Sequence, residues 1–135
     1  MSAARISELV PMLLCEDVQE VLAFYTDVLG FEVRDRMDDV GRSGWVSLQC
    51  GGARIMLASP TYIPAAPKIE GRHTQALHYL YVDDIAALHR SVQERGWPAS
   101  DLVVRFYGMK EFETADPAGH VLVFGQDTDE QPTPE

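Results

Sequence analysis

The sequence predicts an α+β fold: two tandem βαβββ modules that form a cupped, mostly antiparallel sheet with the helices on its outer face. Two apolar, strand-type segments are each followed at once by an acidic helix-capping sequence. The glycines that close the two helices, Gly30 and Gly96, lie 66 residues apart. The turn signals Gly51-Gly52 and Asp116-Pro117-Ala118-Gly119 are separated by 67 residues. A repeat of this period indicates two copies of one unit, each too small to close a sheet alone.

The first module is expected at about residues 8–58. It begins with an apolar strand within residues 8–16, after which Asp17 and Glu20 have the spacing of a helix capping box. Apolar residues at helical spacing continue to Gly30, a residue suited to end a helix. Strands are then predicted at 31–34, 44–50 and 53–58, the last two joined as a hairpin by the glycine pair.

The second module, at about residues 76–125, repeats this order. A strand at 77–82 precedes a helix that is capped by Asp83-Asp84 and closed by Gly96. The remaining strands are expected near 102–107, 111–115 and 120–125. Residues 59–75 hold three prolines and are interpreted as a linker, and the acidic tail 126–135 is expected to be disordered.

Composition limits the partners and the compartment. The 135 residues carry a formal charge of −10 and only two lysines, so a single domain that does not bind nucleic acid is expected. No apolar run is long enough for a membrane helix, and the first residues lack a signal core, so a cytoplasmic protein with no membrane partner is predicted. Cys15 and Cys50 lie in apolar runs and are interpreted as buried thiols in a reducing compartment.

Three segments carry a family resemblance: Val10-Pro11-Met12-Leu13, the string from Phe24 to Phe31 (FYTDVLGF), and the string from Tyr107 to Phe112 (YGMKEF) with Asp116-Pro117-Ala118-Gly119 behind it. They resemble the vicinal-oxygen-chelate superfamily, which includes glyoxalase I, extradiol dioxygenases, fosfomycin-resistance enzymes and the bleomycin-binding resistance proteins. The third segment, the proline of the first strand and the run Tyr79-Leu80-Tyr81-Val82 look most like the bleomycin-binding branch.

Enzymes of that superfamily generally hold one divalent metal ion through His, Gln or Glu side chains on four strands. The matching positions here carry Val10, Met56 (or its neighbour Leu57), Leu77 and Val123. Neither an aliphatic side chain nor a thioether provides the donors that such ions require. The resemblance therefore implies no metal, no cofactor and no catalytic residue at these positions.

Other catalytic arrangements are not favoured by the sequence. His78 stands one residue from the third metal position, but strand alternation puts it on the face of Leu80 and opposite to Tyr79. Neither cysteine has an adjacent histidine, and no nucleophile motif is present. Glu111 and Glu113 lie two apart on one strand face and are interpreted as solvated or rim charges rather than a carboxylate pair.

Strand alternation predicts that aromatic and thioether side chains line the cup, a surface that suits a flat, poorly hydrated ligand. By resemblance, Tyr79 and Tyr107 match positions at which larger tryptophan rings stack on the drug in bleomycin binders. Asp38 and Asp39 match an acidic loop beside that site. The predicted ligand-binding residues are Trp45, Met56, Tyr79, Tyr81, Tyr107, Met109, Glu111, Asp38 and Asp39.

The leading hypothesis is a metal-independent protein that sequesters a cationic aromatic molecule or a glycopeptide antibiotic of the bleomycin type. The excess of acidic residues attracts a cation, and each ring that faces the cation adds roughly 0.5 to 2 kcal/mol. The resemblance also implies a homodimer in which an N-terminal arm of about residues 1–10 is exchanged, with Pro11 on an edge strand.

Two alternatives stay open. The first is an enzyme of the same fold, of the glyoxalase, dioxygenase or thiol-transferase type, either without metal or with a displaced metal on His78, Glu111 and His120. The second is a structural or regulatory dimer whose cup is filled by its own side chains.

Overall fold

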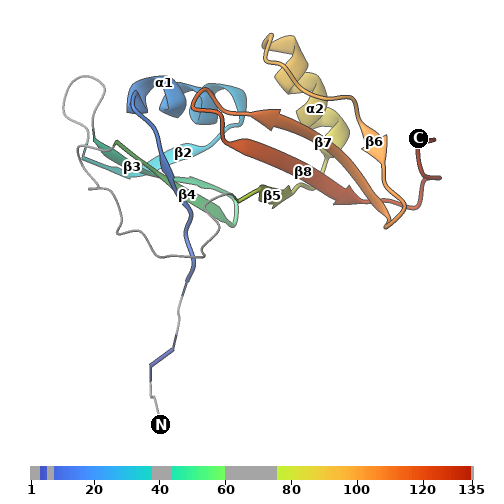
Figure 1. The fold of residues 1–135 in the computed structure, drawn as a ribbon, viewed down its shortest axis with the longest axis horizontal. Helices are drawn as coiled ribbons and strands as arrows, with labels where there is room; N and C mark the ends of the chain where they lie inside the picture. The colour runs from blue at the N-terminus through green and yellow to red at the C-terminus, as the bar shows by residue number, and fades with distance from the viewer. Residues whose placement is uncertain (1–3, 6–7, 38–43, 60–75, 135) are drawn as a thin grey trace, which may run out of the picture.

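The computed structural model describes residues 4–5, 8–37, 44–59 and 76–134. Within them the chain forms two four-stranded sheets, with the helical segments on one side of the sheets (Figure 1). Each sheet has one parallel and two antiparallel strand pairs. The α+β class and the two βαβββ modules predicted from the sequence are therefore confirmed.

The first module forms a sheet with the strand order β1-β4-β3-β2. The Asp17 side chain caps its helix by accepting a hydrogen bond from the Glu20 amide at 3.1 Å, and Gly30 closes it with φ +81°. The second half of this helix widens into a π-helical segment, labelled η1. The elements are β1 (Met12–Leu14), α1 (Val18–Ala23), η1 (Phe24–Val28), β2 (Glu32–Arg36), β3 (Trp45–Cys50) and β4 (Ala53–Ala58).

The second module has the equivalent order β5-β8-β7-β6. Asp84 caps its helix through the Ala87 amide at 3.1 Å. The strand predicted at 102–107 is much shorter, because the chain turns back where the Gly108 amide donates to the Arg105 carbonyl at 3.1 Å. The elements are β5 (His78–Tyr81), α2 (Ile85–Glu94), β6 (Val103–Val104), β7 (Met109–Ala115) and β8 (Val121–Asp127).

Strand alternation separates two faces of each sheet, as expected from the period of two. Leu13, Leu57 and Phe124 belong to the buried core cluster that the helices cover. Met12 and Tyr79, which alternate with core residues, are exposed on the opposite face. That open face is where side chains are available to a ligand.

Several contacts between described residues join the modules. The Tyr25 hydroxyl donates to Asp116 Oδ2 at 2.8 Å, and the His120 ring nitrogen Nε2 lies 2.8 Å from the Leu14 carbonyl oxygen. Trp97 packs its ring 4.8 Å from that of Phe24. The two modules thus share one core.

The structure corrects two expectations from the sequence, the burial of Cys50 and the disorder of the tail. Cys15 is buried, but Cys50 is exposed because it ends β3 at the hairpin. The tail is not disordered over residues 126–134, since β8 runs to Asp127 and Thr133 pairs with Val104 of β6. In the described part of the chain, neither helix has the length and apolar character needed to cross a membrane.

Candidate functional site

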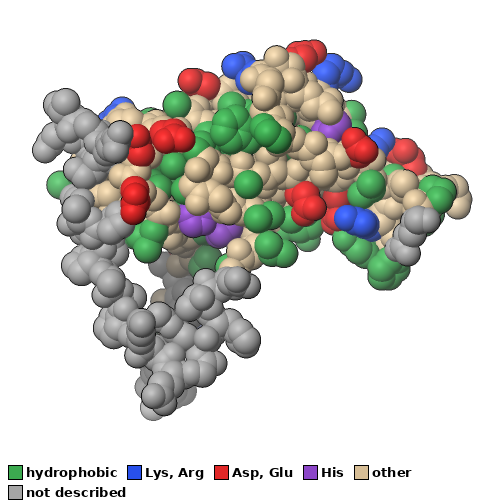
Figure 2. Space-filling view, turned by 45° about the horizontal axis from the view of Figure 1, so that its top comes forward, with side chains coloured by type: hydrophobic (Ala, Val, Ile, Leu, Met, Phe, Trp, Pro, Cys, Tyr) green, Lys and Arg blue, Asp and Glu red, His purple; other side chains and the backbone are tan. Residues whose placement is uncertain are grey.

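A groove of about 660 Å³ lies on the open face of the second sheet. Its described lining residues come from all four strands of that sheet, from the turn between β6 and β7, and from residues 132–134 of the tail. The sequence favoured a cleft between the two modules, whereas this groove belongs to the second module. Exposed hydrophobic side chains stand beside acidic and basic ones at that end of the molecule (Figure 2).

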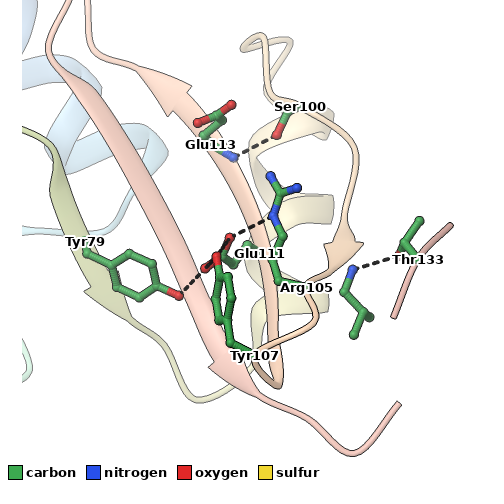
Figure 3. Close-up of polar contacts among 8 residues, drawn as sticks. Tyr79, Ser100, Arg105, Tyr107, Glu111, Glu113 and Thr133 are labelled. Carbon is green, nitrogen blue, oxygen red and sulfur yellow. Dashed lines mark hydrogen bonds and ion pairs between the residues drawn. The ribbon is translucent and has the colours of Figure 1, made fainter. Parts of the chain in front are cut away.

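Glu111 of β7 is the polar centre of the groove (Figure 3). The Tyr79 hydroxyl donates to its Oε2 atom at 2.6 Å, and the Tyr107 hydroxyl lies 2.9 Å from both carboxylate oxygens. Arg105 adds an ion pair, with Nε 3.2 Å from Oε1. Glu111 is only 4% exposed, so its interpretation as a solvated rim charge was wrong. It is a buried carboxylate surrounded by donors.

Gly125 allows Tyr79 to reach this carboxylate. Strand β8 lies between β5, which carries Tyr79, and β7, which carries Glu111, and Gly125 pairs directly with Glu111. A Cβ atom on Gly125 would overlap the hydroxyl end of Tyr79. A glycine inside a strand is a signal for such a close approach, although the sequence does not reveal which group approaches.

The electrostatics keep Glu111 charged and the tyrosines protonated. Burial by itself raises the pKa of Glu111, but hydrogen bonds from Tyr79, Tyr107 and Arg105, together with the Arg105 charge, bring it below its ordinary value. Burial and then the hydrogen bond to Glu111 raise the pKa of Tyr79. The same causes raise the pKa of Tyr107. Both hydroxyls therefore remain donors at neutral pH.

Exposed rings surround the carboxylate. Tyr107 is anchored by its hydroxyl yet 54% exposed, and Phe106 beside it is 86% exposed. Tyr79 and Tyr81 of β5 lie with ring centroids 5.1 Å apart. Tyr79 and Tyr107 are fixed through their hydroxyls and still partly exposed, so a planar ligand can stack on these rings.

The structure brings together part of the predicted site. Tyr79, Tyr107 and Glu111 are hydrogen-bonded to one another, and Tyr81 adjoins Tyr79. Met109 is buried at the start of β7.

Trp45 and Met56 lie on β3 and β4 of the first sheet, and Asp38 and Asp39 fall outside the described residues. Arg105, Phe106 and Gly125 were not predicted. The sequence Arg-Phe-Tyr-Gly at the turn could have indicated Arg105 and Phe106, because they directly precede the predicted site residue Tyr107.

The side chains at the positions inferred for a family metal do not fit a divalent ion. Leu77 and Val123 line the groove without any donor atom, and Met56 lies on the first sheet opposite Met12. Across the described ranges, no three His, Cys, Asp or Glu side chains gather as a metal-binding group. The His78 and His120 rings are 6.4 Å apart. These two histidines do not come together with Glu111 as a metal-binding group, so the displaced metal site considered from the sequence is not formed.

The repeated strand order and the family comparison agree on the class of protein. The family model for the Glyoxalase/Bleomycin resistance protein/Dioxygenase superfamily matches residues 5–124, and the chain belongs to this superfamily. No curated protein shows significant similarity to the chain.

Solved structures with the same fold cover nearly the whole chain. TioX from Micromonospora sp. ML1 is 22% identical, with a TM-score of 0.74 over 90% of this chain and 98% of its own. A lactoylglutathione lyase from Agrobacterium tumefaciens is 22% identical, with a TM-score of 0.66 over 91% and 96%. TnmS3, an antibiotic binding protein from Streptomyces sp. CB03234, is 21% identical, with a TM-score of 0.64 over 93% and 100%. At these identities, the likeness establishes the fold.

Proposed function

We propose that this chain is a metal-independent binding protein that sequesters a planar, cationic aromatic molecule, or a glycopeptide antibiotic of the bleomycin type, in the groove of its second module. One observation carries the proposal: exposed aromatic rings surround a buried, ionised carboxylate. Tyr107 and Tyr79 offer ring faces while their hydroxyls stay fixed on Glu111. This arrangement combines stacking with negative potential, the two interactions that an aromatic cation uses best.

The charges of the groove favour a cation. Arg105 offsets the charge of Glu111, whereas Glu113 also faces the groove and is exposed. The Glu113 amide donates to Ser100 Oγ, while its exposed side chain lines the groove, where a ligand can reach it. The protein as a whole adds a field of −10 formal charges that attracts cations.

Similar proteins lend support. TnmS3, which has the same fold, is described as an antibiotic binding protein. A fold of this kind hosts several activities, so the argument for binding rests on the groove rather than on the likeness.

The test is isothermal titration calorimetry with two probes, metal-free bleomycin and the planar cation ethidium. We expect one probe molecule per groove. Tyr107→Ala should weaken binding about tenfold, because one stacked ring with cation contact contributes roughly 1 kcal/mol or more. Glu113→Gln should weaken binding less and reduce its salt dependence.

The matched control is Trp45→Phe, a ring change on the first sheet that should leave both affinities unchanged. Failure of the wild-type chain to bind either probe below about 100 μM, some 5 kcal/mol of affinity, would refute the proposal. Recovery of a chemically altered probe would instead favour the enzyme alternative.

We also propose that the chain is a homodimer with an exchanged N-terminal arm. Residues 1–3 and 6–7, half of that arm, lie outside the described residues. The described part supports a partner surface, because Leu9, which precedes edge strand β1, and Met12 and Leu14 of β1 are exposed. Sedimentation at micromolar concentration should show a dimer, and a monomer would exclude the exchange.

A further inference from the structure

The C-terminal segment, residues 128–134, is fixed against the second sheet at several points. The Thr128 amide donates to the Gly108 carbonyl at 3.0 Å, and Lys110 Nζ lies 2.9 Å from Glu130 Oε2. Further along, the Thr133 amide donates to the Val104 carbonyl at 2.9 Å. The Val104 amide in turn donates to Thr133 Oγ1 at 2.8 Å. The segment is therefore built onto the edge of the sheet.

This attachment has a geometric consequence at the groove. Val104 belongs to β6, which is the last strand of its sheet, so Thr133 is bonded to the open edge of that sheet. Thr133 makes the bonds, and its neighbours Pro132 and Pro134 line the groove beside it.

Proline is well suited to such a wall. Its ring is apolar, and it has no amide hydrogen that would be left without a partner. The fixed φ angle also limits the freedom that the segment loses when a ligand binds, which lowers the entropic cost of the contact.

Resting on the proposed function, we propose that residues 132–134 are part of the binding site and form its outer wall, opposite the rings of Tyr79 and Tyr107. A planar ligand that stacks on these rings contacts the two prolines along its other edge. The segment thereby sets the width of ligand that the groove accepts.

The test uses full-length variants and the probe, ethidium or metal-free bleomycin, that the wild-type chain binds more tightly. The variants at Pro132, Thr133 and Pro134 leave the charge of the chain unchanged. Pro132→Ala together with Pro134→Ala removes ring atoms from the wall but keeps both bonds of Thr133. Loss of this apolar contact should weaken binding about fivefold, with little change in the melting temperature. Thr133→Ala removes the acceptor of the Val104 amide and should weaken binding similarly, whereas Thr133→Ser should retain wild-type affinity.

Asp129→Asn is the control within the same segment, since Asp129 does not line the groove and its replacement should not alter affinity beyond the small effect of one screened charge. If the wild-type chain binds a probe and the double proline variant binds it equally well, the inference is overturned while the proposed function stands. If the wild-type chain binds neither probe, the proposed function fails and the inference fails with it.

Discussion

At the scale of single residues, Glu111 shows how a carboxylate can be buried on an open sheet face. Removing a carboxylate from water is costly unless donors replace the lost hydration. Here two tyrosine hydroxyls and one guanidinium do so, and none of the three is adjacent to Glu111 in sequence. Glu111 consequently both organises the rings and supplies the negative potential.

The Glu111 carboxylate should therefore contribute pH-dependent stability. Its pKa is lowered in the folded state, so its contribution is complete above the unfolded value of about 4.3 and is lost as the pH falls through the folded value. Glu111→Gln removes this titration and weakens the charged hydrogen bonds, at a cost of roughly 1 to 3 kcal/mol at neutral pH.

Urea unfolding from pH 7 down to pH 3 measures the effect. The difference in unfolding free energy between wild type and Glu111→Gln should shrink as the pH falls. A difference that stays constant over this range would show that the Glu111 charge does not stabilise the fold.

The sequence could identify Tyr79, Tyr107 and Glu111 as candidates but not their mutual contact. The Tyr79–Glu111 bond spans 32 residues and crosses an intervening strand. It depends on Gly125, whose role becomes apparent only when strand order and register are known. Alternation predicts which face a side chain occupies, but not which side chains meet across two strands.

At the scale of elements, local signals predicted the helices well. Asp17 and Asp84 accept hydrogen bonds from the amides of Glu20 and Ala87, and Gly30 and Gly96 have the positive φ angles expected of helix-ending glycines. The prediction that the tail is disordered was wrong. Its polar composition carries no information about the unpaired edge of β6 to which it binds. The position of the tail is determined by hydrogen bonds to residues that lie far away in the sequence.

The capping bond of α2 yields a prediction that separates stability from binding. Asp84→Ala should lower the unfolding free energy by about 1 kcal/mol, because it removes the acceptor for the Ala87 amide. Helix α2 packs against β7 and β8 on the covered side of the sheet, so probe affinity should not change. Calorimetric melting and titration of the same variant test both parts.

Asp83→Ala is the neighbouring control. The Asp83 contact with Gln126 uses its backbone carbonyl, so loss of its side chain should change stability by no more than about 0.5 kcal/mol. Equal losses in both variants would contradict the assignment of Asp84 as the cap.

At the scale of the whole molecule, the two modules are held together by residues that the sequence associated with the family rather than with assembly. Asp116 begins the Asp-Pro-Ala-Gly turn, where its Oδ1 atom accepts bonds from the Ala118 and His120 amides. Its other oxygen, Oδ2, accepts the hydroxyl of Tyr25 from the FYTDVLGF string. Two motifs from different modules thus meet in one buried hydrogen bond, 91 residues apart in sequence.

Tyr25→Phe should weaken this junction while leaving the ring in place. Tyr25 is 1% exposed, and burial followed by the Asp116 charge raises its pKa, so the hydroxyl is a permanent donor. Its removal leaves a buried carboxylate oxygen short of a partner, and the unfolding free energy should fall by about 1 to 3 kcal/mol. The matched change at an exposed tyrosine, Tyr81→Phe, should cost little.

Urea unfolding followed by circular dichroism and by tryptophan fluorescence provides the measurement. Trp45 lies in the first module and Trp97 in the second, at the junction. The wild-type chain should unfold in one transition that both signals follow, because the shared core makes separate unfolding of either module unfavourable. Tyr25→Phe should move that transition to lower urea without splitting it. Two separate transitions in the wild-type chain would show that the modules are independent and that the Tyr25–Asp116 bond does not couple them.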